Sequence, residues 1–216
     1  MTETMQTILT RRSIRAFKPD MLPRETIDAI IEAGLYAPSG MNRQPAVIVA
    51  VQDPETRAKI SHLNAAVMGV DMDPFYGAPT VLVGLADPKA TNEINAVCDG
   101  ALVMGNLMNA AHAVGLGSCW IHRAKQTFEL PEGKELLAKW GLPENLIGIG
   151  NCILGFGSPH QRQCRPGGGC RADRRTRSRL PCGTDRSGDA GFHGDHLLHH
   201  ECLLWCRRDP KDPLYP

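Results

Sequence analysis

The 216 residues suffice for one well-packed domain, or for one domain with an extension, and they carry a formal net charge of +1. This balance argues against a chain built electrostatically for nucleic acid or a membrane surface, and no apolar run approaches the roughly 18 residues that span a bilayer. The N-terminus lacks a basic-then-apolar secretion signal, so a cytoplasmic location is expected. In such a chain the eight cysteines are expected to be free thiols.

The composition changes abruptly near residue 157. Residues 1–157 contain 12 Ile and 10 Val with a net charge of −3, whereas residues 158–216 contain neither residue type and carry +4. A segment without these aliphatics and with scattered Gly and Pro has little from which to build strands or a core. We therefore expect a folded domain over 1–157. The Arg-, Cys- and His-rich tail over 158–216 is expected to be disordered, with the composition of a frameshifted or fused segment.

Hydrophobic periodicity and Gly/Pro boundaries predict alternating helices and strands over the first 157 residues. Helices are expected over 2–10, from Pro23 to before Pro38, from Pro54 to about Val67, from about Glu93 to Val114 and over Lys134–Trp140. Strands are expected over Ala46–Val51, Thr80–Ala86, Ser118–Ile121 and Ile147–Phe156. This alternation indicates a sheet that is covered by helices on both faces.

The predicted helix over 93–114 is apolar almost all round. Because a helix without a polar face must be buried on several sides, it is expected at the centre of the domain or in a subunit interface. Cys98 is expected inside its packed core. Cys119, on the following strand, is either a buried thiol or a redox-active thiol near a cofactor.

Three segments carry residues suited to ligand binding. The string Arg11-Arg12-Ser13-Ile14-Arg15 places three guanidinium groups and a hydroxyl at a helix end. Arginine donates bidentate, charge-assisted hydrogen bonds to phosphate or to a planar carbonyl edge. Taken alone, the string also fits a solvated basic turn.

The second segment is Ala37-Pro38-Ser39-Gly40-Met41-Asn42-Arg43-Gln44-Pro45, between a helix end and a strand start. Its amide side chains both donate and accept, which suits the mixed edge of a flavin or base, although a simple helix stop gives the same pattern. The third, Gly115 to His122, is a Gly-flanked strand end that could let the backbone approach a flat ring or could be an ordinary packed strand. Phe75 and Tyr76 either border a substrate pocket or pack within their loop.

Order and spacing connect these segments. An N-terminal RRSxR string is followed about 25 residues later by PSxxNxQP, then by GNLMNAAHAVGLGSCWI and by a final GIGNCILGFG strand. Over residues 4–157 this arrangement resembles the nitroreductase family. The resemblance implies an α/β (α+β) three-layer sandwich with a central mixed sheet flanked by helices, in an intertwined homodimer. It also implies an enzyme that binds FMN and uses NAD(P)H as co-substrate.

The resemblance also assigns roles to residues. Arg11, Arg12 and Ser13 resemble the family's contacts to the FMN phosphate and ribityl chain, and Arg15 resembles the catalytic basic residue at the pyrimidine edge of the flavin. Cofactor contacts from the other subunit are implied for Pro38, Ser39, Asn42 and Gln44. The backbone of Trp120, Ile121 and His122 corresponds to the loop that approaches the flavin's reactive nitrogen. The basic segment that usually ends the family's chains is not recognisable after Gly157.

The implied reaction is a ping-pong cycle in which NAD(P)H reduces FMN and a nitroaromatic, quinone or similar flat acceptor is then reduced. Because the cofactor performs the chemistry, no side-chain nucleophile is needed. Dehalogenation or flavin fragmentation, as in some relatives, is the alternative within the fold. A flavin-binding or metal-binding module without turnover is the alternative from another class. The tail's His and Cys residues between His193 and Cys206 could bind zinc, but they lack the spacing of known structural sites, and no metal is expected.

Overall fold

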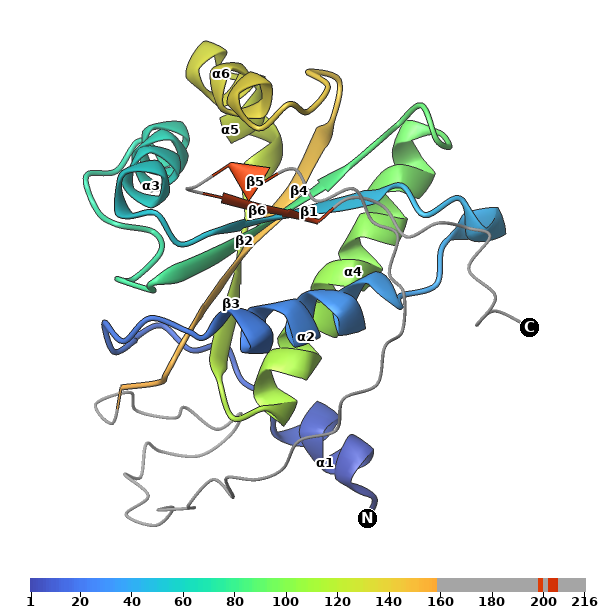
Figure 1. The fold of residues 1–216 in the computed structure, drawn as a ribbon, viewed down its shortest axis with the longest axis vertical. Coiled ribbons are helices and arrows are strands. Elements are labelled where there is room, and N and C mark those ends of the chain that lie inside the picture. The colour runs from blue at the N-terminus through green and yellow to red at the C-terminus, as the bar shows by residue number, and fades with distance from the viewer. Residues whose placement is uncertain (159–197, 200–201, 206–216) are drawn as a thin grey trace.

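The structure, a computed structural model, describes residues 1–158, 198–199 and 202–205 (Figure 1). Its helices are α1 (Glu3–Thr10), α2 (Arg24–Leu35), the short 3-10 helix η1 (Gly40–Asn42), α3 (Pro54–Met68), α4 (Glu93–Ala113), α5 (Ala124–Glu129) and α6 (Pro131–Lys139). Its strands are β1 (Ala46–Val51), β2 (Thr80–Ala86), β3 (Gly117–Ile121), β4 (Ile147–Gly155), β5 (Leu198–His199) and β6 (Cys202–Trp205). The helices and strands predicted within 1–157 are confirmed to within a few residues, whereas α5 was not foreseen.

The strands form one sheet in the order β3-β4-β2-β1-β6-β5. Every ladder between the described strands is antiparallel, with Val49 opposite Val83 and Cys119 opposite Ile153. The predicted mixed sheet is therefore corrected to an antiparallel one. Its parallel component within the described residues is an isolated bridge between Ser13 and Ser118. The parallel direction arises there because the segment after α1 runs alongside β3.

Two layers of helices cover the sheet, as Figure 1 shows. Alternate strand residues face opposite sides: Val49 and Val83 point toward α3, α5 and α6, whereas Ile48 and Leu82 point toward α2 and α4. We call the two hydrophobic layers the α3-side core and the α4-side core. Burial on both faces explains why β1 and β2 are continuous apolar runs.

Local signals fix several helix boundaries. Asp53 caps α3 by accepting a hydrogen bond from the Thr56 N–H at 2.7 Å, and Pro54 occupies the first turn. Gly69 ends α3 with φ +69°, a left-handed conformation that glycine adopts without strain. The unforeseen α5 follows Arg123, which itself has φ +74° and provides no side-chain cap. A six-residue helix with neither cap nor clear periodicity leaves little trace in the sequence.

Helix α4 crosses the whole domain but is not buried all round. One side packs on the sheet, where the Met104 sulfur would lie 2.7 Å from a Cβ atom added at Gly84. The opposite side exposes Ile94, Val97 and Leu102, with Ile94 75% exposed. Cys98 is exposed as well, so its predicted place in the helix core is wrong, because position 98 turns away from the sheet. None of the helices in the described ranges has the length and hydrophobicity that crossing a bilayer would require.

The tail contributes two short strands to the sheet. The backbone of β6 pairs antiparallel with β1, with Val51 opposite Cys202 and Ile48 opposite Trp205. This differs from the expectation that the tail would supply no strands. The physical reason is that pairing needs only backbone N–H and C=O groups, which the outer edge of β1 offers to any extended segment. The rest of the predicted tail lies outside the described residues, and the boundary at 157 stays a prediction.

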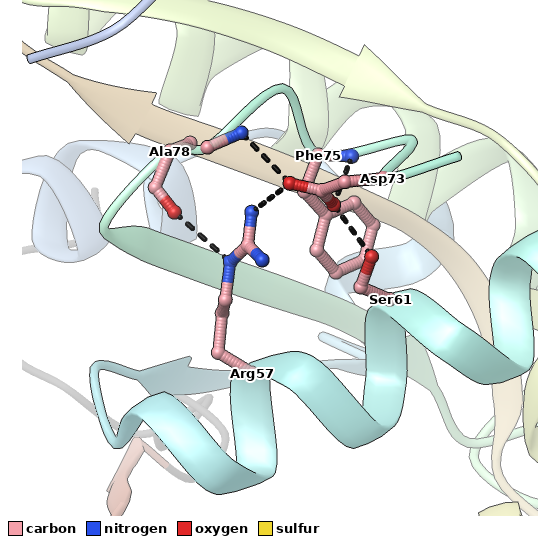
Figure 2. Close-up of polar contacts among 6 residues, drawn as sticks. Arg57, Ser61, Asp73, Phe75 and Ala78 are labelled. Carbon is pink, nitrogen blue, oxygen red and sulfur yellow. Dashed lines mark hydrogen bonds and ion pairs between the residues drawn. The ribbon is translucent and has the colours of Figure 1, made fainter. Parts of the chain in front are cut away.

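A single carboxylate organises the loop between α3 and β2 (Figure 2). Asp73 accepts hydrogen bonds from the Arg57 guanidinium and the Ser61 hydroxyl, both at 2.5 Å, and from the backbone N–H groups of Phe75 and Gly77 at 2.9 and 2.8 Å. Arg57 also donates to the Ala78 carbonyl at 3.1 Å and lies over the Phe75 ring. Phe75 is fully buried, which identifies it as core packing.

Partial burial by itself raises the pKa of Asp73, but the hydrogen bonds from Ser61, Arg57, Gly77 and Phe75 outweigh it, so the pKa lies below the ordinary value. A carboxyl whose pKa is lowered by folding stabilises the fold fully above its ordinary pKa of 3.8. That contribution is lost as the pH falls through the lowered value.

We expect Asp73→Asn to lower the free energy of unfolding at pH 7 by about 1–3 kcal/mol, because the neutral amide cannot accept all four hydrogen bonds. The difference from the unmodified protein should shrink as the pH drops below 3.8. Thermal midpoints of both proteins across this range measure it. The exposed Asp71 of the same loop gives the control Asp71→Asn, which should change little. A deficit of constant size down to the lowest pH would contradict the assignment.

Candidate functional site

The segment that follows α1 is fixed against the free edge of β3. Ser13 forms a bridge with Ser118, and the Ile14 N–H donates to the Ser118 carbonyl at 2.9 Å. The Ile14 side chain fills the space over Gly117, where it would lie 2.8 Å from an added Cβ atom. The predicted binding string is therefore part of the sheet's border and is held by backbone contacts.

The three arginines of this segment differ in their surroundings. The Nη1 atom of Arg11 is buried and has no hydrogen-bond partner among the described residues. Arg12 is exposed, and its Nη1 donates to the carbonyl oxygens of Leu9 and Arg11 at 2.8 and 2.7 Å. Arg15 is exposed. A buried guanidinium donor with no partner is costly to leave unsatisfied, so Arg11 is a strong candidate for contact with an anion.

A histidine that the sequence analysis did not single out lies beside this string. His112, in the last turn of α4, has its Nε2 2.9 Å from the Thr10 hydroxyl oxygen. Since that hydroxyl donates its proton to the Gln6 carbonyl at 2.6 Å, the imidazole Nε2–H must be the donor to Thr10. Burial, and then the charges of Arg11 and Arg12, lower the pKa of His112. The imidazole thus joins the end of α4 to the start of the arginine string.

The second predicted segment is a tight, self-bonded turn between α2 and β1. The Ser39 hydroxyl accepts from the Gln44 N–H at 3.0 Å, and the Asn42 carbonyl oxygen accepts from the Gln44 side-chain amide at 2.9 Å. Met41, Asn42 and Gln44 have φ values of 54°, 54° and 45°, which are uncommon for residues other than glycine. Strained backbone of this kind concentrates at functional sites. Pro38 is exposed at the start of the turn.

A buried carboxylate on α4 holds this turn in place. Asp99 is 6% exposed, and its two oxygens accept from the Gly40 N–H at 3.1 and 3.2 Å. Asp99 is not among the predicted site residues, because the helix over 93–114 was expected to be apolar almost all round. The one available signal was an acidic residue inside an otherwise hydrophobic helix, where a charge needs a partner.

The two polar segments lie at different places along α4. Asp99 anchors the Ser39–Gln44 turn, whereas His112 adjoins the Arg11–Ser13 string. At 1.5 Å per residue, Asp99 and His112 are about 20 Å apart along the helix axis. Within one chain the structure therefore does not bring the first two predicted clusters together.

The third predicted segment combines core and surface positions. The Ile121 side chain is buried in the α3-side core, and the Trp120 indole lies over Gly150 with no room for a side chain there. His122 is exposed, and its carbonyl accepts from the Asn64 side-chain amide at 2.8 Å. The Ile121 side chain is thus part of the core, and the predicted cofactor role of this stretch concerns its backbone. The first-turn N–H groups of α5, which begins at Ala124, lie just beyond the predicted stretch.

The described residues contain no group of three or more His, Cys, Asp or Glu side chains that could hold a metal ion. The zinc alternative between His193 and Cys206 lies outside the described residues, apart from the backbone of His199 and Cys202. Cys119 and Cys152 are buried free thiols, and burial raises the pKa of Cys152 to about 12. Burial at Cys119 agrees with the expectation of a packed strand thiol.

Known proteins resemble this chain over most of its length. An Archaeoglobus fulgidus protein whose name pairs NADH dehydrogenase with NAD(P)H nitroreductase is 33% identical over 158 residues, which cover 72% of this chain and 86% of that protein. The Bacillus subtilis FMN reductase (NAD(P)H) is 30% identical over 72% of this chain and 66% of its own length. The crystal structure of a Bacteroides fragilis nitroreductase with bound FMN superimposes with a TM-score of 0.68 and 29% identity, covering 78% of this chain and 96% of that one.

The sequence model of the nitroreductase family matches residues 8–158 of this chain. This range contains the arginine string, the Ser39–Gln44 turn, α4 and the strand-to-helix connection after β3. On sequence and fold together, this chain belongs to the nitroreductase family.

Proposed function

We propose that the protein is an FMN-dependent oxidoreductase that uses NAD(P)H to reduce nitroaromatics, quinones or similar flat acceptors. The observation that carries the proposal is the Arg11 guanidinium, whose buried Nη1 lacks a partner within the described part of the chain. Two residues further along the same segment, Ser13 forms a bridge with Ser118, whose buried hydroxyl also lacks a partner there. Unsatisfied donors of this kind fit a phosphate group. FMN and NAD(P)H stand in the names of relatives.

The residues present fit FMN in three groups. Arg11, Arg12 and Ser13 would hold the phosphate and ribityl chain, and Arg15 would lie at the pyrimidine edge of the ring. The Pro38–Gln44 turn would come from the other subunit, with Ser39, Asn42 and Gln44 as its polar contacts. The backbone around Trp120, Ile121 and His122, including the first turn of α5, would approach the ring from its own subunit.

When bound, FMN would supply the redox chemistry between NAD(P)H and the acceptor, which we propose to follow a ping-pong order. The chain's own contribution is binding and electrostatics. The fixed cation of Arg15 would stabilise negative charge at the pyrimidine edge, and a fixed charge acts most strongly where water is excluded. The hydrogen bonds within the Ser39–Gln44 turn orient its amides before the cofactor arrives, which lowers the entropy lost on binding.

A homodimer completes this site. The midpoint between Asp99 and His112 falls at Gly105 and Asn106, and a Cβ atom added at Gly105 would have no neighbour within 4 Å. This outward side of α4 also carries the exposed Ile94 and Leu102. An antiparallel crossing of two α4 helices at Gly105 brings the Asp99-anchored turn of one subunit beside the arginine string of the other. In one chain the two clusters are about 20 Å apart along α4. In the dimer, each cluster of one copy lies beside the other cluster of its partner.

The first test concerns the cofactor. The purified full chain should be yellow and release FMN, not FAD, on denaturation, because the arginine string matches a single phosphate and no adenosine site is proposed. Adding NADH or NADPH without oxygen should bleach the flavin, and a quinone or nitroaromatic should restore its colour. Release of FAD, or a colourless protein that FMN does not reconstitute, would overturn the proposal. Colour without bleaching would identify a flavin-binding module without turnover.

The second test concerns the dimer. Leu102→Glu places a charge on the outward side of α4 and should convert the dimer to a monomer that binds FMN roughly 10-fold or more weakly. Light scattering gives the mass, and flavin fluorescence gives the affinity. The control Met72→Glu, on an exposed loop methionine, should leave both unchanged. A monomer with full FMN affinity would rule out a site shared between subunits.

The third test concerns Arg15. Arg15→Ala should slow flavin reduction more than it weakens FMN binding, because its partner is charge that develops on reduction. Loss of one charge-assisted contact costs about 1.5–3 kcal/mol, or roughly 10–150-fold in rate. Anaerobic stopped-flow absorbance measures the rate. Arg15→Lys should recover part of it, and the exposed Arg43→Ala serves as the control. An unchanged reduction rate would remove Arg15 from the mechanism.

A further inference from the structure

The α3-side core contains a small polar group amid hydrophobic side chains. Asn64 of α3, Thr127 of α5 and Asn151 of β4 are each 0% exposed. The layer around them consists of residues such as Val83, Ile121 and Phe128. Buried amides almost always have hydrogen-bond partners, from the protein or from ordered water. Each polar atom of these side chains is therefore expected to have a partner.

Asn64 is satisfied at one end only. Its Nδ2 donates to the His122 carbonyl at 2.8 Å and lies 3.5 Å from the Thr127 hydroxyl. Its Oδ1 is buried and has no partner among the residues that the structure describes. An amide oxygen can accept two hydrogen bonds, and this one accepts none from residues 1–158.

Asn151 is unsatisfied at both ends. Neither its Nδ2 nor its Oδ1 has a hydrogen-bond partner in the described ranges. Rotating the amide by 180°, which exchanges the two atoms, would therefore leave both without a partner. On β4 its neighbour Ile153 points into the α3-side core, and side chains two residues apart share a face. Asn151 therefore points into the same layer as Asn64.

The two residues that carry the unsatisfied atoms are connected through the end of β3. Asn151 lies directly opposite Ile121 on β3, and Ile121 precedes His122, whose carbonyl holds Asn64. The start of α5 lies directly against β4 here, because the backbone of Ala124 and Lys125 lies so close to Gly148 that no side chain fits there. The unsatisfied amides of α3 and β4 thus both face the region behind the turn from β3 to α5.

We propose that this place is a buried hydration site, in which an ordered water molecule links the side chains of Asn64 and Asn151. The water donates to Asn64 Oδ1 and accepts from Asn151 Nδ2. If the Asn151 amide presents its Oδ1 instead, the water donates to both residues. Its remaining capacity serves a third hydrogen bond, the usual number for a buried water. The inference is independent of the proposed function.

The water would add β4 to the polar contact that already joins α3 to the β3-to-α5 turn. Through Asn64 it reaches the His122 carbonyl, and the next residue, Arg123, holds its backbone at φ +74°. Through Asn151 it reaches the centre of β4. The water site would therefore help to hold the β3-to-α5 turn in position from the core side.

A crystal structure of the full chain at about 1.5 Å resolution tests the site directly. We expect a well-ordered water within about 2.7–3.2 Å of Asn64 Oδ1 and of one side-chain atom of Asn151. A direct hydrogen bond between the two amides, or an absence of density between them, would overturn the proposal. This measurement uses the unmodified protein and does not depend on whether any variant folds.

A double-mutant cycle tests the link in solution. Asn64→Ala and Asn151→Ala should each lower the thermal midpoint by roughly 2–12 °C, and the double variant should lose clearly less than the sum, because either change alone removes the bridge. The control is Asn106, whose side-chain amide donates to the Ala33 carbonyl on the other side of the sheet. Asn106→Ala and Asn151→Ala should add. Additive losses for Asn64 and Asn151 would show that no water connects them.

Discussion

Burial of the sheet on both faces is the constraint from which the rest of the structure follows. The strands β1 and β2 are apolar at nearly every position, so neither face can be left to water. Helices α2 and α4 cover one face, and α3, α5 and α6 cover the other. Polar segments are consequently displaced to the ends and edges of the strands. The arginine string borders β3, and the Ser39–Gln44 turn precedes β1.

Helix α4 relates these peripheral segments to one another. Asp99 near its beginning holds one of them by a buried carboxylate, and His112 in its last turn adjoins the other. A rigid helix fixes the distance between them at about 20 Å. The same helix presents an outward side with Gly105 at its middle. Under the proposed function, this geometry makes one helix both the separator of two half-sites and the contact through which two chains complete them.

Several polar residues inside the domain fix segments of the backbone. Asp73 gathers two side chains and two N–H groups around one loop, Asp99 holds Gly40, and Asn64 holds the His122 carbonyl. Each fixes a segment that has no regular hydrogen-bonding pattern of its own, where an unpaired buried group is costly. The two apolar layers therefore stabilise the domain, whereas a few buried polar contacts determine the conformation of its loops.

The sequence by itself determined the strands, the long helices and the family. Continuous apolar runs and Gly and Pro boundaries, such as Pro54 at the start of α3, are local signals. The arginine string and the Ser39–Gln44 turn were also recognisable from spacing. Only the tertiary structure decided that the sheet is antiparallel, that Cys98 is exposed, that β6 pairs with β1, and that Asp99, His112 and Asn64 hold the predicted segments. These facts depend on contacts between residues that are distant in the sequence and are brought together when both faces of the sheet are covered. Local sequence patterns contain no information on such contacts.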